Sequence, residues 1–147
     1  MAATRIEHSL MIDRPVCGVF AFMEKAENMP RWAENVIEAA QTSEGPVGIG
    51  TTCQVTNKAM GYTFVQDFVV TEYERDSVYA ARTTAGPFPL STRYDLSEED
   101  GATRVHVVSE ADLSKFGGLA GPFIHKMAQK QIETDHARLK KLLEREG

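Results

Sequence analysis

The sequence predicts an α+β fold in which a curved antiparallel sheet of about seven strands grips one long C-terminal helix. Residues 122–146 carry apolar side chains at the three- and four-residue spacing of one helical face. Residues 36–113 instead form short alternating segments separated by turn residues. A strand and two short helical segments precede them. We expect one domain, residues 1–147, because 147 residues is an ordinary domain size.

Composition and charge limit the classes of function. The formal net charge of −5 argues against sequence-independent binding of nucleic acid, whose phosphates attract a basic surface. No apolar run approaches the roughly 20 residues of a membrane-spanning helix, and the N-terminus lacks the pattern of a signal peptide. We therefore expect a cytoplasmic protein without membrane insertion. Cys17 and Cys53 are expected to be buried as small apolar side chains.

The first part of the chain predicts a strand and then two short helices. Residues 4–13 place Ile6 and Ile12 on the same side of a strand. Asp13 is a candidate N-cap, and Pro15 suits the first turn of the helix that follows. After a turn, the second short helical segment carries Trp32.

The middle of the chain predicts further strands, and the end predicts the long helix. The strand series begins at Val36 and continues with residues 53–56, 62–74, 78–85, 90–96 and 103–113. Short connections between successive strands favour antiparallel hairpins. Pro122 fits the first turn of the final helix, and Lys140 and Arg145 complement its dipole near the C-terminal end.

Several motifs give the chain a family resemblance. They are residues 12–16 (Ile-Asp-Arg-Pro-Val), 19–20 (Val-Phe), 28–32 (Asn-Met-Pro-Arg-Trp), 48–51 (Gly-Ile-Gly-Thr), 70–74 (Val-Thr-Glu-Tyr-Glu) and 139–142 (Leu-Lys-Lys-Leu). Together they resemble the polyketide cyclase/dehydrase-like family of the SRPBCC superfamily, the START-like, birch-pollen-allergen-like helix-grip proteins. The resemblance covers almost the whole chain. It implies a deep, mostly apolar cavity between the sheet and the C-terminal helix, which holds a hydrophobic small molecule. It offers no shared catalytic signature, and we assign no catalytic residue.

Strand alternation selects candidate ligand-binding residues. If the bulkier set of residues 62–70 faces inward, the concave side of that strand carries Phe64, Gln66 and Phe68. The same reasoning turns Thr92 and Tyr94 inward on residues 90–96, and Ser109 on the last strand. Apolar walls with a few convergent polar groups are typical of a ligand pocket. The alternative is that these polar groups bond to one another or to buried water.

Other candidates carry two interpretations each. Arg82 either faces inward, where it could anchor a carboxylate or an enolate, or is a solvated surface residue, which we favour. Trp32 is either a ligand platform or a core wedge. On the long helix, Phe123, Met127 and Gln131 either line the pocket or belong to the plain core. His125, Gln129 and His136 lie nearer the flanks of the apolar stripe, and we expect them to be exposed.

The leading functional hypothesis is a binding module for a hydrophobic small molecule such as a polyketide, lipid or aromatic metabolite. The alternative is an aromatase/cyclase-type enzyme, in which Tyr94 or Arg82 would polarise a carbonyl. A third hypothesis is an interaction protein that binds a peptide in the same groove. The four histidines are widely spaced and give no metal motif, so we expect neither metal nor cofactor. The sequence leaves a homodimer open.

Overall fold

The computed structural model describes residues 4–59, 61–113 and 121–146. Its centre is a seven-stranded antiparallel sheet with the strand order β1-β7-β6-β5-β4-β3-β2. The strands are β1 (Thr4–Ile12), β2 (Val36–Gln41), β3 (Thr52–Ala59), β4 (Tyr62–Glu74), β5 (Val78–Ala85), β6 (Leu90–Glu99) and β7 (Ala102–Ala111). The predicted fold class is therefore confirmed.

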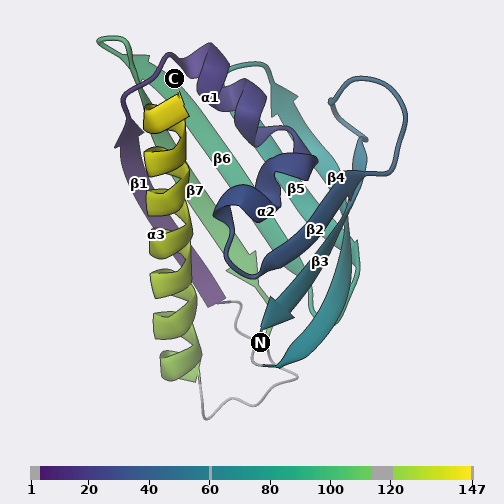
Figure 1. Ribbon diagram of the computed structural model, residues 1–147. Helices are drawn as coiled ribbons and strands as arrows, with labels where there is room; N and C mark the ends of the chain where they lie inside the picture. The colour runs from purple at the N-terminus through teal and green to yellow at the C-terminus, as the bar shows by residue number, and fades with distance from the viewer. Residues whose placement is uncertain (1–3, 60, 114–120, 147) are drawn as a thin grey trace.

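The helices cover the concave side of this sheet. Between β1 and β2 the chain forms α1 (Val16–Met23), the 3-10 helix η1 (Ala26–Asn28) and α2 (Met29–Trp32). Because β1 and β2 occupy opposite edges of the sheet, this α1–α2 segment (residues 16–32) must cross its concave face (Figure 1). The long helix α3 (Gly121–Glu146) lies along the side of the sheet formed by β1 and β7.

Hairpin geometry explains where the strands end. β4 and β5 have the predicted bounds, whereas β6 extends three residues beyond its predicted end. Asp100 and Gly101 both have positive φ angles, 52° and 83°, so a two-residue turn of the tight hairpin kind joins β6 to β7. The pairing of Glu99 with Ala102 therefore continues up to the turn.

The start of α1 differs from the prediction. Pro15 occupies the N-cap position with extended backbone and makes no side-chain capping bond, and a carboxylate oxygen of Glu98 accepts from the Val16 N–H at 3.3 Å. Asp13 instead offers its backbone N–H to a carboxylate oxygen of Glu144 at 2.8 Å. The side chain that the sequence suggested as a cap is therefore not used, and the backbone of the same residue ties β1 to the end of α3.

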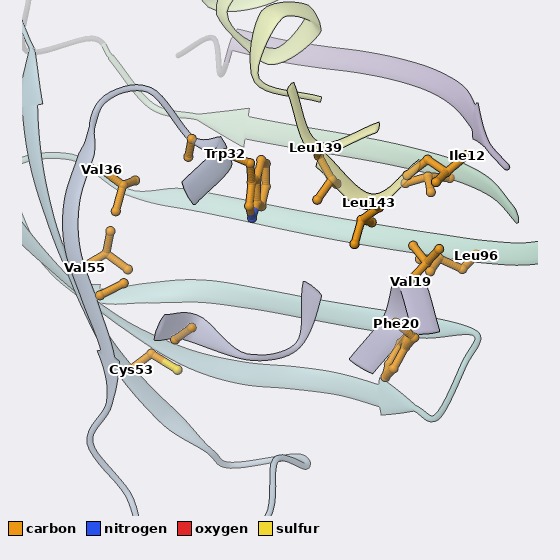
Figure 2. Close-up of a cluster of buried hydrophobic side chains, with 14 residues drawn as sticks. Ile12, Val19, Phe20, Trp32, Val36, Cys53, Val55, Leu96, Leu139 and Leu143 are labelled. Carbon is orange, nitrogen blue, oxygen red and sulfur yellow. The ribbon is translucent and has the colours of Figure 1, made fainter. Parts of the chain in front are cut away.

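The hydrophobic core lies where α1 and α3 meet the sheet (Figure 2). Leu139 of α3 is 0% exposed, and it belongs to one buried cluster with Val19 and Phe20 of α1 and with Trp32 of α2. Burial of such side chains is the main favourable term in folding. Figure 2 shows Leu139 and Leu143 directed toward this cluster.

The N-terminal half of α3 contributes less to the core than its stripe predicted. Phe123 is 64% exposed and Met127 is 42% exposed, so the sheet grips the C-terminal half of the helix. The two cysteines differ in burial. Cys53 is buried as expected, whereas Cys17 on α1 is exposed, so the prediction for Cys17 is wrong. Among the described helices, none has both the length and the apolar content to cross a membrane.

Candidate ligand-binding site

A cavity of about 160 Å³ lies between the α1–α2 segment and the concave side of strands β3 to β6. Its walls are mostly apolar, with Phe20, Met23 and Met29 on the helical side. Phe68, Val70 and Ala81 are among the strand residues on the other side. We expected α3 to form one wall, but no residue of its described part lines the cavity. The crossing segment forms that wall because it lies in front of the middle strands, while α3 lies along β1 and β7.

Four of the predicted site residues do line the cavity. They are Trp32 from α2, Phe68 from β4, and Thr92 and Tyr94 from β6. On β6 the whole predicted inner set is present, because Leu90 and Leu96 complete the same wall. The alternation of side chains along these strands was therefore interpreted correctly.

Three predicted residues face inward but lie outside the cavity lining. Gln66 is buried, and its side-chain carbonyl accepts a hydrogen bond from the Asn57 amide at 3.2 Å. Ser109 hydrogen-bonds to the hydroxyl of Thr92 at 2.8 Å, and the Phe64 ring packs against Phe88 at 6.0 Å between centroids. For Ser109, and for the carbonyl of Gln66, the alternative held: these groups bond to neighbouring side chains.

Four other predicted residues lie away from the cavity. Arg82 is exposed, since the opposite face of β5, with Tyr79 and Ala81, lines the cavity. The exposures of Phe123 and Met127 likewise place them at the surface. Gln131 donates to Glu34 at 3.0 Å and to Asp135 at 2.9 Å, so it links α3 to the turn before β2.

The predicted exposure of His136 is wrong, because this side chain is buried beside the cavity-lining residues Trp32 and Tyr94. It is 3% exposed, whereas His125 is exposed as expected and Gln129 is half-buried. His136 completes the stripe of Ile132, Leu139 and Leu143 at four- and three-residue spacing, and that spacing was the available signal.

The hydrogen bonds of His136 determine its tautomer. Its Nδ1 lies 2.8 Å from the backbone carbonyl oxygen of Ile132, which can only accept a hydrogen bond. Nδ1 therefore carries the proton, and the neutral ring leaves Nε2 as an acceptor. The Tyr94 hydroxyl lies 2.9 Å from Nε2 and donates to it.

Burial keeps this pair uncharged. Burial in an apolar environment lowers the pKa of His136 to about 4, although the bond to Ile132 partly opposes the change. Burial is also the main cause of the raised pKa of Tyr94, with a smaller contribution from Asp135. The imidazole and the phenol are therefore both neutral near pH 7.

A second hydrogen-bonded pair, formed by Tyr73 and Glu24, lies at the α1 end of the cavity. Glu24 lines the cavity, and one of its carboxylate oxygens accepts a hydrogen bond from Tyr73 at 2.5 Å. Burial, followed by this bond to Glu24, raises the pKa of the Tyr73 phenol. Burial also raises the pKa of Tyr79, whose ring lines the cavity between the two pairs.

The indole of Trp32 is the remaining polar group of the lining. The residue is 5% exposed, and its ring lies edge-on to His136 with centroids 5.1 Å apart. The buried Nε1–H has no hydrogen-bond partner in the described part of the chain. In the view of Figure 2, the nitrogen lies on the ring edge turned toward Cys53 and Phe20, which also line the cavity.

Metal ligation receives no support from the described ranges. Across residues 4–59, 61–113 and 121–146, no three His, Cys, Asp or Glu side chains gather as metal ligands would. The chemistry that this site offers is therefore a mostly apolar space with a few hydrogen-bonding groups, which include the carboxylate of Glu24.

Comparison with known proteins agrees with this architecture. A family model described as polyketide cyclase/dehydrase and lipid transport matches residues 3–144. No curated protein matches the chain. A START superfamily protein from Mycobacterium smegmatis is 13% identical and aligns over 99% of this chain and 100% of its own, with a TM-score of 0.85.

Two further solved structures have the same fold. The Zhui aromatase/cyclase from Streptomyces sp. R1128 is 12% identical over 98% of this chain and 95% of its own, with a TM-score of 0.79. Ara h 8.0201 is 16% identical over 96% of this chain and 97% of its own, with a TM-score of 0.72. At these identities the likeness establishes the helix-grip fold, and the predicted family resemblance is confirmed.

Proposed function

The chain belongs to the polyketide cyclase/dehydrase and lipid transport family, and we propose that it binds a hydrophobic small molecule in the cavity behind the α1–α2 segment. The observation that carries this proposal is the mostly apolar space of about 160 Å³ between the α1–α2 segment and the sheet. A dry apolar cavity of about 150 Å³ is large enough to bind benzene. The volume therefore supports a ligand, or a part of a ligand, the size of a single ring.

The experiment uses toluene as the probe and the single tryptophan of the chain as the reporter. Because Trp32 lines the cavity, its indole N–H resonance and its fluorescence report binding there without overlap from a second tryptophan. We expect saturable shifts of the indole resonance on addition of toluene. An indole resonance that does not move would contradict the proposal.

Two variants of β5 form a matched pair. Ala81→Leu places three extra carbon atoms in the cavity and should abolish toluene binding. Ala85→Leu adds the same atoms on the same strand at an exposed position, and it should bind toluene as the parent does. Equal binding by both variants would place the site elsewhere.

The aromatase/cyclase alternative has less support from the described residues. The Zhui protein, a fold relative, is an aromatase/cyclase, and Tyr94, one of the two residues named for that hypothesis, lines the cavity. However, Arg82 is exposed on the other face of β5, and the cavity is small for a folded polyketide chain. Turnover of a short poly-β-ketone mimic that is lost in Tyr94→Phe would favour the enzyme instead.

A further inference from the structure

Two residues that line the cavity and pack against His136 carry polar groups of opposite hydrogen-bonding character. One is the indole of Trp32, which can only donate a hydrogen bond. The other is the hydroxyl oxygen of Tyr94, whose proton is already directed to another group. This donor and this acceptor come from α2 and β6, and the fold brings them together.

The donor is buried and unused. Trp32 is 5% exposed, and its Nε1–H lacks an acceptor among the residues that the structure describes. A buried N–H without an acceptor is unfavourable, and native proteins usually pair such groups with protein, water or ligand. An oxygen atom of a bound molecule would satisfy it.

The acceptor is fixed by the histidine behind it. Because Nδ1 of His136 donates to the Ile132 carbonyl, Nε2 must accept, and the Tyr94 hydroxyl must donate to it. The phenol oxygen then offers only lone pairs to any other partner. It would accept a hydrogen bond from a ligand, and it has no second proton to give to a carbonyl.

Both rings pack against the same imidazole. The centroid of His136 lies 5.1 Å from that of Trp32 and 5.6 Å from that of Tyr94. The two cavity-lining residues that carry the donor and the acceptor are therefore neighbours of one imidazole. A hydroxyl group is the simplest ligand group that both accepts and donates through one atom.

We propose that the cavity selects a single-ring molecule bearing one hydroxyl group, of the phenol type. Its oxygen accepts a hydrogen bond from Trp32 Nε1, and its proton is donated to the Tyr94 oxygen. This inference rests on the proposed function, because it names the class of ligand for the same cavity.

The test compares three probes of similar size by calorimetry: toluene, anisole and phenol. Toluene makes no hydrogen bond, the anisole oxygen can accept from Trp32, and phenol can do both. In Tyr94→Phe we expect phenol affinity, measured relative to toluene, to fall about tenfold, the change expected for one net hydrogen bond. Anisole affinity relative to toluene should stay unchanged in that variant.

Trp32→Phe removes the donor and keeps an aromatic ring. It should lower the affinity of both phenol and anisole about tenfold relative to toluene. Toluene is the internal control in each variant, because it reports any change of cavity shape or stability. In the parent, the indole N–H resonance should move downfield with phenol by more than with toluene.

The outcomes separate the two proposals. If toluene binds and the relative affinity of phenol is the same in the parent and both variants, the hydroxyl inference is overturned and the binding function stands. If anisole depends on Tyr94 as strongly as phenol does, the assigned direction of the Tyr94 hydrogen bond is wrong. If none of the probes binds the parent, both proposals fail.

Discussion

His136 shows how one buried side chain can make stability depend on pH. In the folded protein it is neutral, donates to Ile132 and accepts from Tyr94. Protonation would turn its acceptor nitrogen into a donor and place a charge beside the rings of Trp32 and His8. Because burial disfavours the charged imidazolium in the folded state, the pKa of His136 is lowered to about 4.

The pH prediction follows from the sign of this difference. An unfolded histidine titrates near about 6.5, so both states are neutral above that pH and the full stability is present. As the pH falls from about 6.5 toward about 4, the unfolded state gains the proton first, and stability is lost. The loss from this group is on the order of 3 kcal/mol, and it should show in urea unfolding curves measured across this range.

A His136→Gln variant is the control for other titrating groups. It keeps a side-chain oxygen that can accept from Tyr94, but it cannot be protonated in this range. We expect the free energy of unfolding of the variant to depend less on pH between about 4 and about 6.5. Parallel pH profiles of parent and variant would show that His136 does not control this dependence.

At the scale of the elements, α3 has two halves with different roles. Its C-terminal half buries Leu139 completely against the core, whereas Phe123 in its first turns is mostly exposed. The apolar stripe in the sequence runs along the whole helix, but only the C-terminal half of the helix packs closely against the rest of the protein. The sheet and α1 supply partners to the second half, where Leu143 joins the same cluster.

This division predicts very different costs for two truncations on one helix. Leu139→Ala should reduce the free energy of unfolding by about 2–5 kcal/mol, because it removes buried methyl groups and leaves a void. Phe123→Ala should change it by less than about 1 kcal/mol, since the ring is largely in solvent. Equal costs, measured by urea denaturation, would contradict the assignment of the gripped half.

The crossing α1–α2 segment is the second decisive element. It forms one wall of the cavity with Phe20 and Met29, and it places Trp32 beside His136 of α3. Trp32 belongs to the buried core cluster, so the core interpretation from the sequence is confirmed, and it also lines the cavity, so its role as a ligand platform stays a prediction. Binding in the cavity itself remains a proposal.

At the scale of the whole molecule, the sheet order separates a rigid region from a more accessible edge. β7 pairs with both β1 and β6, and its Val105 and Val107 are fully buried. β2 is an edge strand whose register shifts next to Ile37, and this side chain is exposed. Local opening requires less free energy where fewer buried contacts must be broken.

Hydrogen exchange should therefore differ across the sheet. We expect the amides of Val105 and Val107 to exchange last, at rates set by global unfolding, and those near Ile37 to exchange much earlier. Residue-resolved exchange measured by NMR tests this order. Protection around Ile37 equal to that of β7 would show that the edge strand opens only with the whole domain.

The sequence by itself determined the elements and the inward faces of residues 62–70 and 90–96, whereas it left the inward face of residues 78–85 open. Alternation along 62–70 and 90–96 depends on neighbouring residues, and so it correctly turned Phe68, Thr92 and Tyr94 toward the cavity. The stripe of α3 and the hairpin turns are likewise local patterns. They were sufficient for the fold class, whereas the family resemblance rests on the short sequence motifs.

Only the tertiary structure decided which of the inward-facing residues line the same cavity. Gln66 and Ser109 have the expected direction, but hydrogen bonds to other side chains occupy the carbonyl of Gln66 and the hydroxyl of Ser109. The position of the cavity behind the α1–α2 segment, and the burial of His136 against Tyr94, depend on which elements cross in front of which strands. Such contacts join residues 42 positions apart in the chain, and periodicity cannot reveal them, because it reports the direction of a side chain and not its partner.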